Sequence, residues 1–115
     1  PNKHIVARYF DSIKNFGINN DHEGLDFFID KKEQCHLKQL PFISETGYIV
    51  FSIGGNHATK KMPEEKWREL AEKTNKPIVI LGGKNEMQAA EIISFNLINV
   101  INLCGTTTLH ESAFV

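Results

Sequence analysis

Residues 78–83 read IVILGG, a short apolar run that ends directly in two glycines. The same order occurs at residues 48–55, which read YIVFSIGG, and at residues 100–105, which read VINLCG. Continuous apolar runs of this length are typical of strands buried in a parallel sheet. A helical pattern follows each run, so strand and helix alternate three times in the last 68 residues. This alternation predicts an α/β fold with a parallel sheet, flanking helices and right-handed crossovers.

The helix expected after the first pair of glycines is the clearest of the three. It begins near Pro63, because proline suits the first position of a helix. Trp67, Leu70 and Ala71 recur at helical spacing and are expected to form its buried stripe. Charged side chains four residues apart are expected to pair on its exposed side, namely Glu64 with Arg68 and Glu69 with Lys73.

Two more helices are expected, over residues 85–93 and from Leu109 to the end of the chain. Thr108 and Glu111 have the spacing of a capping box, in which each side chain bonds a backbone amide of the other residue. No internal sequence repeat accompanies the alternation. Three strand–turn–helix units without a repeat predict half of a Rossmann-like domain.

The first 46 residues are less regular. Apolar residues at helical spacing predict a helix over residues 2–16, which Asn2 would cap and Gly17 would close. A short strand is expected over residues 25–29, and a domain boundary within residues 31–46. The sequence therefore predicts a helical and linker segment at 1–46 and the Rossmann-like part at 47–115.

Composition excludes several classes of function. Lys plus Arg is 13 and Asp plus Glu is 14, so the net charge of −1 argues against a dedicated nucleic-acid binder. No apolar run approaches the roughly 18 residues of a membrane span, and no signal segment opens the chain. Two cysteines, Cys35 and Cys104, provide no disulfide scaffold, which favours the cytoplasm. The five histidines have no metal-ligand spacing with these cysteines, so no metal site is expected.

Five of the eight glycines come directly after the three expected strands: Gly54, Gly55, Gly82, Gly83 and Gly105. In open α/β sheets, ligands bind beyond the carboxyl ends of the strands, where all five would lie. Glycine there lets the backbone approach a ligand closely. The alternative is that these glycines only serve the turns between strand and helix.

The turn at residues 54–63 reads GGNHATKKMP. Free amides and lysines ahead of a helix suit a phosphate or a diphosphate. The turn is neither a P-loop nor a dinucleotide fingerprint, because it lacks the glycine directly before the lysine and the third glycine that these motifs require. Lysines before a helix are also often only solvated, and that interpretation stays open.

The second and third turns supply other polar side chains. Glu86, at the start of a helix, could accept hydrogen bonds from a ribose, or could simply be a first-turn acid favoured by the helix dipole. Residues 105–108 read GTTT and place hydroxyl groups at the end of a strand. Among them, Thr108 is expected to be a helix cap rather than a ligand contact.

Taken together, these stretches resemble a known family. Residues 48–115 resemble the start of the C-terminal domain of the ADP-heptose:lipopolysaccharide heptosyltransferases, glycosyltransferase family 9, and residues 4–18 are similar to the last helix of the N-terminal domain. Three groups of residues carry the resemblance: KKMP at 60–63 with WREL at 67–70, ILGGKNE at 80–86, and NLCGTTTL at 102–109.

The resemblance implies a two-domain GT-B glycosyltransferase that moves a heptose, or a related sugar, from a nucleotide-diphosphate donor to the lipopolysaccharide core. An ADP-sugar is the favoured donor, and no cofactor is implied. By the resemblance, Lys60 would hold the donor diphosphate, Glu86 the ribose, and Thr107 would lie near the adenine. Gly55 and Asn56 occupy a loop that in the family lies by the phosphates.

The sequence departs from the family in several places. Met62 stands where the family usually has tryptophan, and the family's Asp-Ser-Gly…His segment would follow Val115. The chain begins at Pro1 and ends in a helical pattern without a stop signal, which suggests a segment of a longer protein. We therefore expect these 115 residues alone to be inactive as a transferase and to expose apolar surface through which copies could associate.

Two alternatives stay open from sequence. The chain could be a non-catalytic nucleotide- or phosphate-binding module that shares the fold, because a fold does not determine a function. It could also be a purely structural interaction domain, although the three clustered glycine turns argue against this alternative. For a transferase, the expected location is the cytoplasm, at the inner face of the inner membrane.

Overall fold

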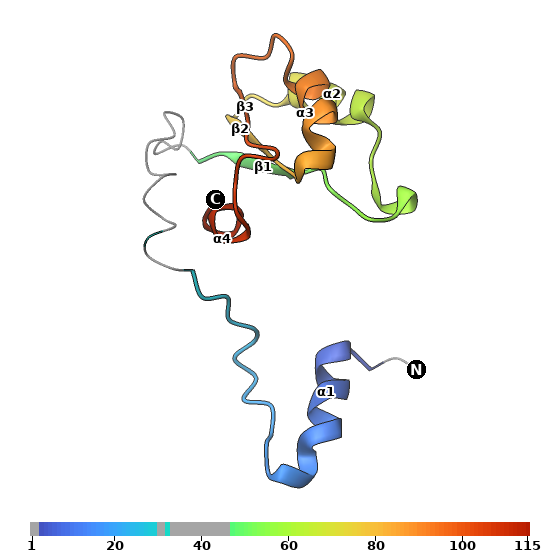
Figure 1. The fold of residues 1–115 in the computed structure, drawn as a ribbon, viewed down its shortest axis with the longest axis vertical. Helices are drawn as coiled ribbons and strands as arrows, with labels where there is room; N and C mark the ends of the chain where they lie inside the picture. Colours follow the sequence, from blue (N-terminus) through green and yellow to red (C-terminus); the bar gives the residue numbers. More distant parts are fainter. Residues whose placement is uncertain (1–2, 30–31, 33–46) are drawn as a thin grey trace.

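A computed structural model of the chain describes residues 3–29, 32 and 47–115 (Figure 1). Its sheet contains β1 (Ile49–Ser52), β2 (Ile78–Leu81) and β3 (Val100–Asn102), all parallel and in the order β1-β2-β3. In register, Ile78 lies opposite Ile49 on one side and Val100 on the other. The predicted α/β class and all three C-terminal strands are confirmed.

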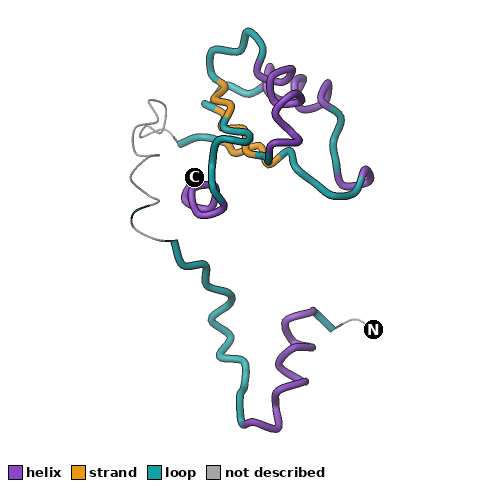
Figure 2. The backbone as a smooth tube through the Cα atoms, viewed as in Figure 1, coloured by secondary structure: helices purple, strands orange, loops and turns teal. Residues whose placement is uncertain are grey.

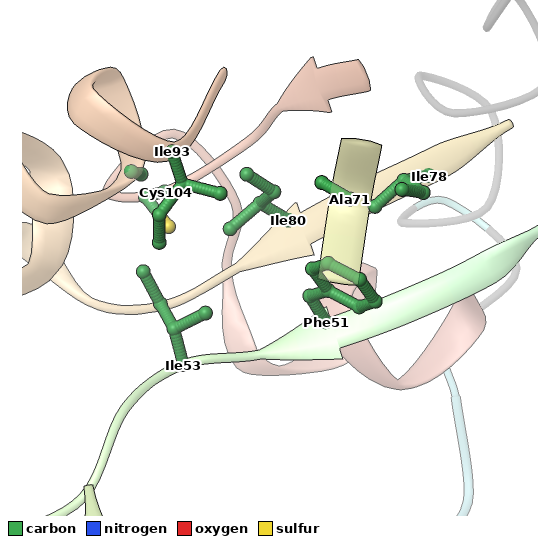
Figure 3. Close-up of a cluster of buried hydrophobic side chains, with 8 residues drawn as sticks. Phe51, Ile53, Ala71, Ile78, Ile80, Ile93 and Cys104 are labelled. Carbon is green, nitrogen blue, oxygen red and sulfur yellow. The ribbon is translucent and has the colours of Figure 1, made fainter. Parts of the chain in front are cut away.

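Both crossover helices, α2 (Glu64–Lys73) and α3 (Met87–Ser94), cover the same face of the sheet and pack against each other (Figures 1 and 2). Right-handed crossovers between strands that follow one another in a single direction put their helices on one side. The core lies between these helices and the sheet (Figure 3), and its buried members are Phe51, Ile53, Ala71, Ile78, Ile80, Ala90, Ile93 and Cys104.

The strands differ in how deeply they are buried. All four residues of β2 are buried, as expected for a strand with a neighbour on each side. In β1 only Phe51 is buried, whereas Ile49 and Val50 are 37% and 39% exposed. The apolar run at 48–53 thus forms an edge strand among the described residues, and the expectation that it is buried throughout is wrong. Sequence hydrophobicity alone does not distinguish an edge strand from a central one.

Helix α2 packs through Trp67, whose ring lies 4.8 Å from that of Phe51 between centroids, and through Ala71, which is 1% exposed. Leu70, predicted to share this stripe, is 45% exposed and is not among the residues packed against the core. Pro63 is the N-cap rather than the first helical residue. Its backbone carbonyl accepts hydrogen bonds from the amides of Lys66 and Trp67 and so begins the helix.

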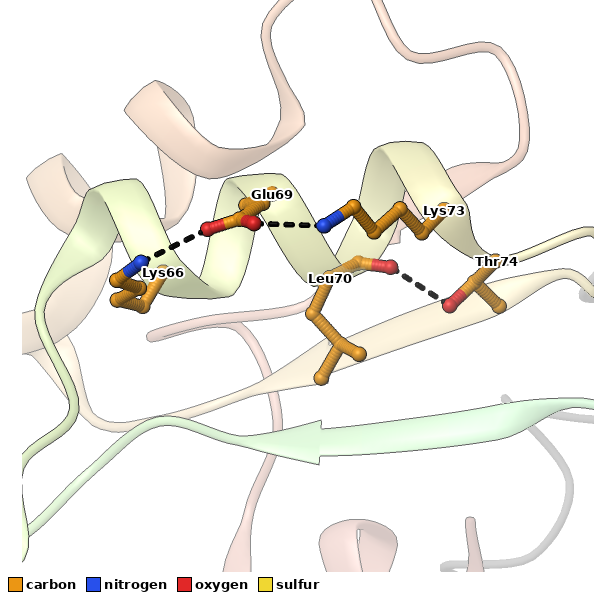
Figure 4. Close-up of polar contacts among 5 residues, drawn as sticks. All are labelled: Lys66, Glu69, Leu70, Lys73 and Thr74. Atoms are coloured by element: carbon orange, nitrogen blue, oxygen red, sulfur yellow. Dashed lines mark hydrogen bonds and ion pairs between the residues drawn. The ribbon is translucent and has the colours of Figure 1, made fainter.

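The ion pairs on α2 are partly those expected (Figure 4). Glu69 pairs with Lys73 at 2.6 Å, as predicted, and also with Lys66 at 3.0 Å. The hydrogen bond from Lys73, followed by that from Lys66, holds the pKa of Glu69 below its usual value. Arg68 pairs with Glu72 at 3.0 Å instead of the predicted Glu64.

The end of α3 is tied to α2 by Arg68. Its guanidinium donates hydrogen bonds to the carbonyl oxygens of Ile92 at 3.0 Å and of Phe95 at 2.9 Å. The last carbonyls of a helix have no partner within the helix, so a cation there satisfies them and opposes the helix dipole. The predicted helix over 85–93 is confirmed, with a 3-10 turn, η4 (Lys84–Glu86), before α3.

Helix α4 (Leu109–Phe114) lies on the other face of the sheet from α2 and α3 (Figure 1). The predicted capping box is confirmed: Thr108 Oγ1 accepts from the amide of Glu111 at 3.2 Å, and Glu111 Oε2 accepts from the amide of Thr108 at 2.7 Å. The Tyr48 hydroxyl donates to the carbonyl of Val115 and thereby joins α4 to the start of β1.

The N-terminal segment contains α1 (Ile5–Ile13) and the 3-10 turn η1 (Lys14–Phe16), which ends at Gly17 with φ of 74°. Gly17 thus closes this helix as predicted. His4 is its N-cap, since its Nδ1 accepts from the amide of Val6 at 3.4 Å; Asn2, the predicted cap, lies outside the described residues.

The strand expected over residues 25–29 is wrong. Leu25 and Phe28 are 81% and 83% exposed, and the segment belongs to no strand. An apolar pattern without a pairing partner does not form a sheet. Phe27 contacts His110 of α4, with ring centroids 5.7 Å apart, so this segment passes beside the sheet domain. None of the helices in the described part of the chain is long and apolar enough to cross a membrane.

Candidate functional site

The carboxyl ends of the strands open into a cavity of about 610 Å³, which we call the glycine cavity. It lies between the end of the sheet and α4. Its walls combine the predicted glycine turns with α4 and one residue of the N-terminal segment: Phe27, Ser52, Gly54, Leu81, Gly82, Gly83, Thr107, Leu109, Ser112 and Ala113. Its size is within the range of pockets that hold small molecules.

A second cavity, of about 390 Å³, lies at the N-terminal ends of α2 and α3. Lys61 and Glu86 line it on the polar side, and Trp67 lines it on the apolar side. We call it the Glu86 cavity. The indole Nε1 of Trp67 is buried and has no hydrogen-bond partner among the described residues.

Glu86 is held in place by its own turn. Its Oε2 accepts a hydrogen bond from the amide of Gly83 at 3.1 Å, and the amide of Glu86 donates to the carbonyl of Gly83 at 3.1 Å. The carboxylate of Glu86 thus makes the acid's half of a capping box at the start of the helix, and the other half is a backbone bond because glycine has no side chain. The side chain of Glu86 is only 14% exposed.

Gly54 and Gly83 lie close to the carboxylate of Glu86. A Cβ atom on Gly83 would lie 3.3 Å from Glu86 Oε2, and one on Gly54 would lie 3.8 Å from the same oxygen. Both glycines also line the glycine cavity. The carboxylate of Glu86 thus lies next to two of the glycines that line the glycine cavity.

Thr107, the third predicted contact, lines the glycine cavity with the glycines of the first two turns. Its hydroxyl lies 2.8 Å from that of Ser112, so α4 fixes the threonine side chain. Gly105 precedes it with φ of 70°, a left-handed conformation that suits glycine and turns the chain from β3 toward α4.

The structure does not gather all of the predicted donor-site residues. Asn56 and Lys60 are exposed in the loop between β1 and α2 and line neither cavity, and Lys60 ends the 3-10 turn η3 (Ala58–Lys60). Gly55 lies against the following lysines, since a Cβ there would be 3.5 Å from Lys61 Cγ and 3.7 Å from the carbonyl oxygen of Lys60.

Sequence reasoning missed Lys61. Its Nζ lies 3.0 Å from Glu86 Oε1 and joins the first strand–helix turn to the second. The signal was present as a second lysine beside Lys60 and an acid in the next turn. Pairing across 25 positions is a tertiary contact that no local spacing rule predicts.

The described part of the chain offers neither a reactive thiol nor a metal cluster at this edge. Cys104, 3% exposed, lies behind Gly82, and burial together with the charge of Glu86 raises the pKa of its thiol to about 11. A neutral, buried thiol is unreactive. Within the described residues, no three His, Cys, Asp or Glu side chains gather to hold a metal ion. The site therefore offers binding groups: backbone amides, hydroxyls, lysines and one fixed carboxylate.

Comparisons with known proteins agree with this architecture. The family model of glycosyltransferase family 9 (heptosyltransferase) matches residues 1–115. The crystal structure of the glycosyl transferase family 9 from Veillonella parvula DSM 2008 is similar, with a TM-score of 0.81 and 19% sequence identity. The match covers 99% of this chain and 35% of that one, so the chain spans about a third of its length. A search of curated proteins found no match.

Proposed function

The chain belongs to glycosyltransferase family 9, and on this premise we propose that it forms the donor-binding part of a two-domain GT-B enzyme. In this proposal, residues 47–115 begin the nucleotide-sugar domain, and residues 1–46 are the end of the acceptor-binding domain and the linker. The transferred group is a heptose or a related sugar. The acceptor is the lipopolysaccharide core, and the reaction takes place at the cytoplasmic face of the inner membrane.

The observation that carries the proposal is the position of Glu86. A carboxylate held by the Gly83 amide lines one cavity and lies next to two glycine turns that line another, of 610 Å³, at the carboxyl edge of a parallel sheet. Ligands of open α/β sheets bind at this edge, and acids placed there accept hydrogen bonds from the ribose of nucleotides. We assign Glu86 to the ribose of an ADP-sugar on this basis.

The other donor contacts follow from the chemistry of each group. The backbone amide of Gly55 and the ammonium of Lys60 suit a diphosphate, and Asn56 adds an amide side chain in the same exposed loop. During transfer, negative charge develops on the departing diphosphate, and a cation beside it lowers the barrier. Thr107, in the glycine cavity, is assigned to the neighbourhood of the base.

The proposal is tested by measuring ADP release from an ADP-sugar by the full-length protein, with lipopolysaccharide core as acceptor. Lys60→Met should raise the donor KM and lower kcat, because the lysine acts on both bound and departing diphosphate. Lys66→Met, which removes an equal charge from the exposed side of α2, is the matched control and should leave both constants unchanged. Unchanged kinetics in Lys60→Met would contradict the assignment, and donor binding without turnover would favour a non-catalytic nucleotide-binding module.

A further inference from the structure

The two adjacent lysines of the first turn have different surroundings. Lys61 reaches Glu86 at 3.0 Å, and its aliphatic stem lies against Gly55. Lys60 makes no side-chain hydrogen bond or ion pair with any residue the structure describes. Lys61 is therefore paired with the carboxylate of the next turn, whereas the charge of Lys60 is available to a ligand.

The Lys61–Glu86 pair also differs from the ion pairs on α2. Lys66 and Glu69 have the same separation of 3.0 Å, but their side chains are 65% and 46% exposed. Lys61 is 44% exposed, whereas Glu86 is only 14% exposed and lines a cavity. Exposed pairs contribute little, but a carboxylate withdrawn from water depends on each donor that compensates its charge.

Among the residues that the structure describes, two donors reach the carboxylate of Glu86, which leaves about half of its acceptor positions unused. A carboxylate accepts about four hydrogen bonds, two at each oxygen. Lys61 uses one position at Oε1, and the Gly83 amide uses one at Oε2. About two acceptor positions remain, one on each oxygen, which matches the two neighbouring hydroxyl groups of a ribose.

We propose that Lys61 is a positioning residue: its ion pair fixes Glu86 so that the carboxylate accepts both hydroxyls of the vicinal diol of a bound nucleotide. This inference rests on the proposed function, since it assumes that Glu86 faces the ribose. Lys61 also neutralises Glu86, so that the carboxylate does not repel the diphosphate that Lys60 binds. The adjacent lysines thus serve the two halves of the donor separately.

The test compares the affinities of ADP and 2′-deoxy-ADP for the full-length protein by calorimetry. Glu86→Gln measures how much of the preference for ADP comes from the carboxylate. Lys61→Met keeps the aliphatic stem but removes the charge, and Lys61→Arg restores a cation. Lys66→Met is the matched control, because it breaks an ion pair of the same length outside both cavities.

We expect the wild type to prefer ADP and Lys61→Met to reduce this preference by about fivefold, the size expected for a partly exposed ion pair. Lys61→Arg should recover most of the preference, and Lys66→Met should not change it. If Lys61 only stabilised the structure, Lys61→Met would weaken the binding of both nucleotides equally.

Two results would contradict the account, and they are distinguishable. If Glu86→Gln abolishes the preference while Lys61→Met keeps it in full, the positioning role of Lys61 is wrong and the proposed function stands. If the wild type does not distinguish the two nucleotides, or Glu86→Gln keeps the preference, the ribose assignment itself is wrong. The positions of the Gly83 amide and Glu86 side-chain NMR signals provide a readout without nucleotide, and both should shift in Lys61→Met more than in Lys66→Met.

Discussion

Gly82 lies so close to Cys104 that the end of β2 has no room for a side chain. A Cβ atom on Gly82 would be 2.9 Å from Cys104 Sγ and 3.0 Å from Glu86 Cβ. Both contacts are shorter than carbon and sulfur tolerate, and Cys104 and Glu86 are held by the core and by the Gly83 turn. Gly82→Ala should therefore lower the free energy of unfolding by about 1–3 kcal/mol, as measured by urea denaturation.

Gly54→Ala is the matched control for this change. A Cβ there meets its nearest neighbour, the Glu86 carboxylate, at 3.8 Å, which is ordinary van der Waals contact. The stability should stay within about 1 kcal/mol of the wild type, because alanine also restricts the unfolded chain. Equal losses in both variants would show that crowding against Cys104 is not the cause.

Arg68→Met should loosen the junction between α2 and α3. The guanidinium bonds two carbonyl oxygens at the end of α3, and methionine keeps the apolar stem but no donor. Hydrogen bonds to a charged group at a partly exposed site predict a loss of about 1–2 kcal/mol in the free energy of unfolding.

Lys66→Met, on the exposed side of the same helix, is the control for Arg68→Met. Its urea midpoint should match that of the wild type within error, because exposed ion pairs contribute little. Amide hydrogen exchange gives a second measurement: protection in the last turn of α3 should fall in Arg68→Met alone. Protection that is unchanged there would refute the role of Arg68 as a cap.

Thr108→Ala should destabilise α4. The threonine hydroxyl is the N-cap acceptor for the amide of Glu111, and loss of such a cap costs about 1 kcal/mol. Thr108→Ser keeps the acceptor and should be close to the wild type. Proton exchange at the Glu111 amide, followed by NMR, should accelerate in the alanine variant and stay slow in the serine variant. The same rate in both would mean that the cap does not hold the helix.

Alkaline pH should destabilise the chain through Cys104. Burial, with a smaller contribution from Glu86, raises the pKa of the folded thiol from 9.0 to about 11, so the unfolded state loses its proton first. Stability is then unaffected below about pH 9 and falls between pH 9 and 11 by at most about 1.4 kcal/mol per pH unit.

This effect is isolated by comparing the urea unfolding of two variants. One carries Cys35→Ser alone, and the other carries Cys35→Ser together with Cys104→Ala, so all other titrating groups are common to both. The first should lose stability more steeply with rising pH. Parallel pH curves would show that the folded thiol titrates normally.

The sheet and its helices could be predicted because each element carries its own local signal. Apolar runs ending in glycine gave three strands, and Thr108 with Glu111 gave a capping box that the structure has. The exposure of side chains and the pairing of strands could not be predicted in the same way. The exposure of Val50 and Leu70 depends on which neighbours lie beside them. Residues 25–29 have the composition of a strand but pair with no strand in the part of the chain that the structure describes. Pairing is a property of the fold, not of the segment.

In the candidate site, too, the positions set by topology could be predicted, but the side-chain contacts could not. The topology of a parallel sheet places Gly54, Gly83 and Thr107 at one edge, and the structure brings these three together. The side-chain contact between Lys61 and Glu86 was beyond sequence reasoning, because it depends on how the first loop folds back over Gly55. Adjacent lysines in a loop have no periodicity that distinguishes their partners.

The most direct test of the central claim, that the glycine edge binds the nucleotide of a sugar donor, is an NMR titration of backbone amides with ADP, UDP and GDP. The account predicts that ADP selectively shifts the amides of residues 54–60 together with those of Gly83, Glu86 and Thr107. Shifts of equal size with all three nucleotides would show that the turn binds phosphate groups without distinguishing the base. Shifts confined to residues away from the carboxyl edge of the sheet, in a well-folded sample, would contradict the claim.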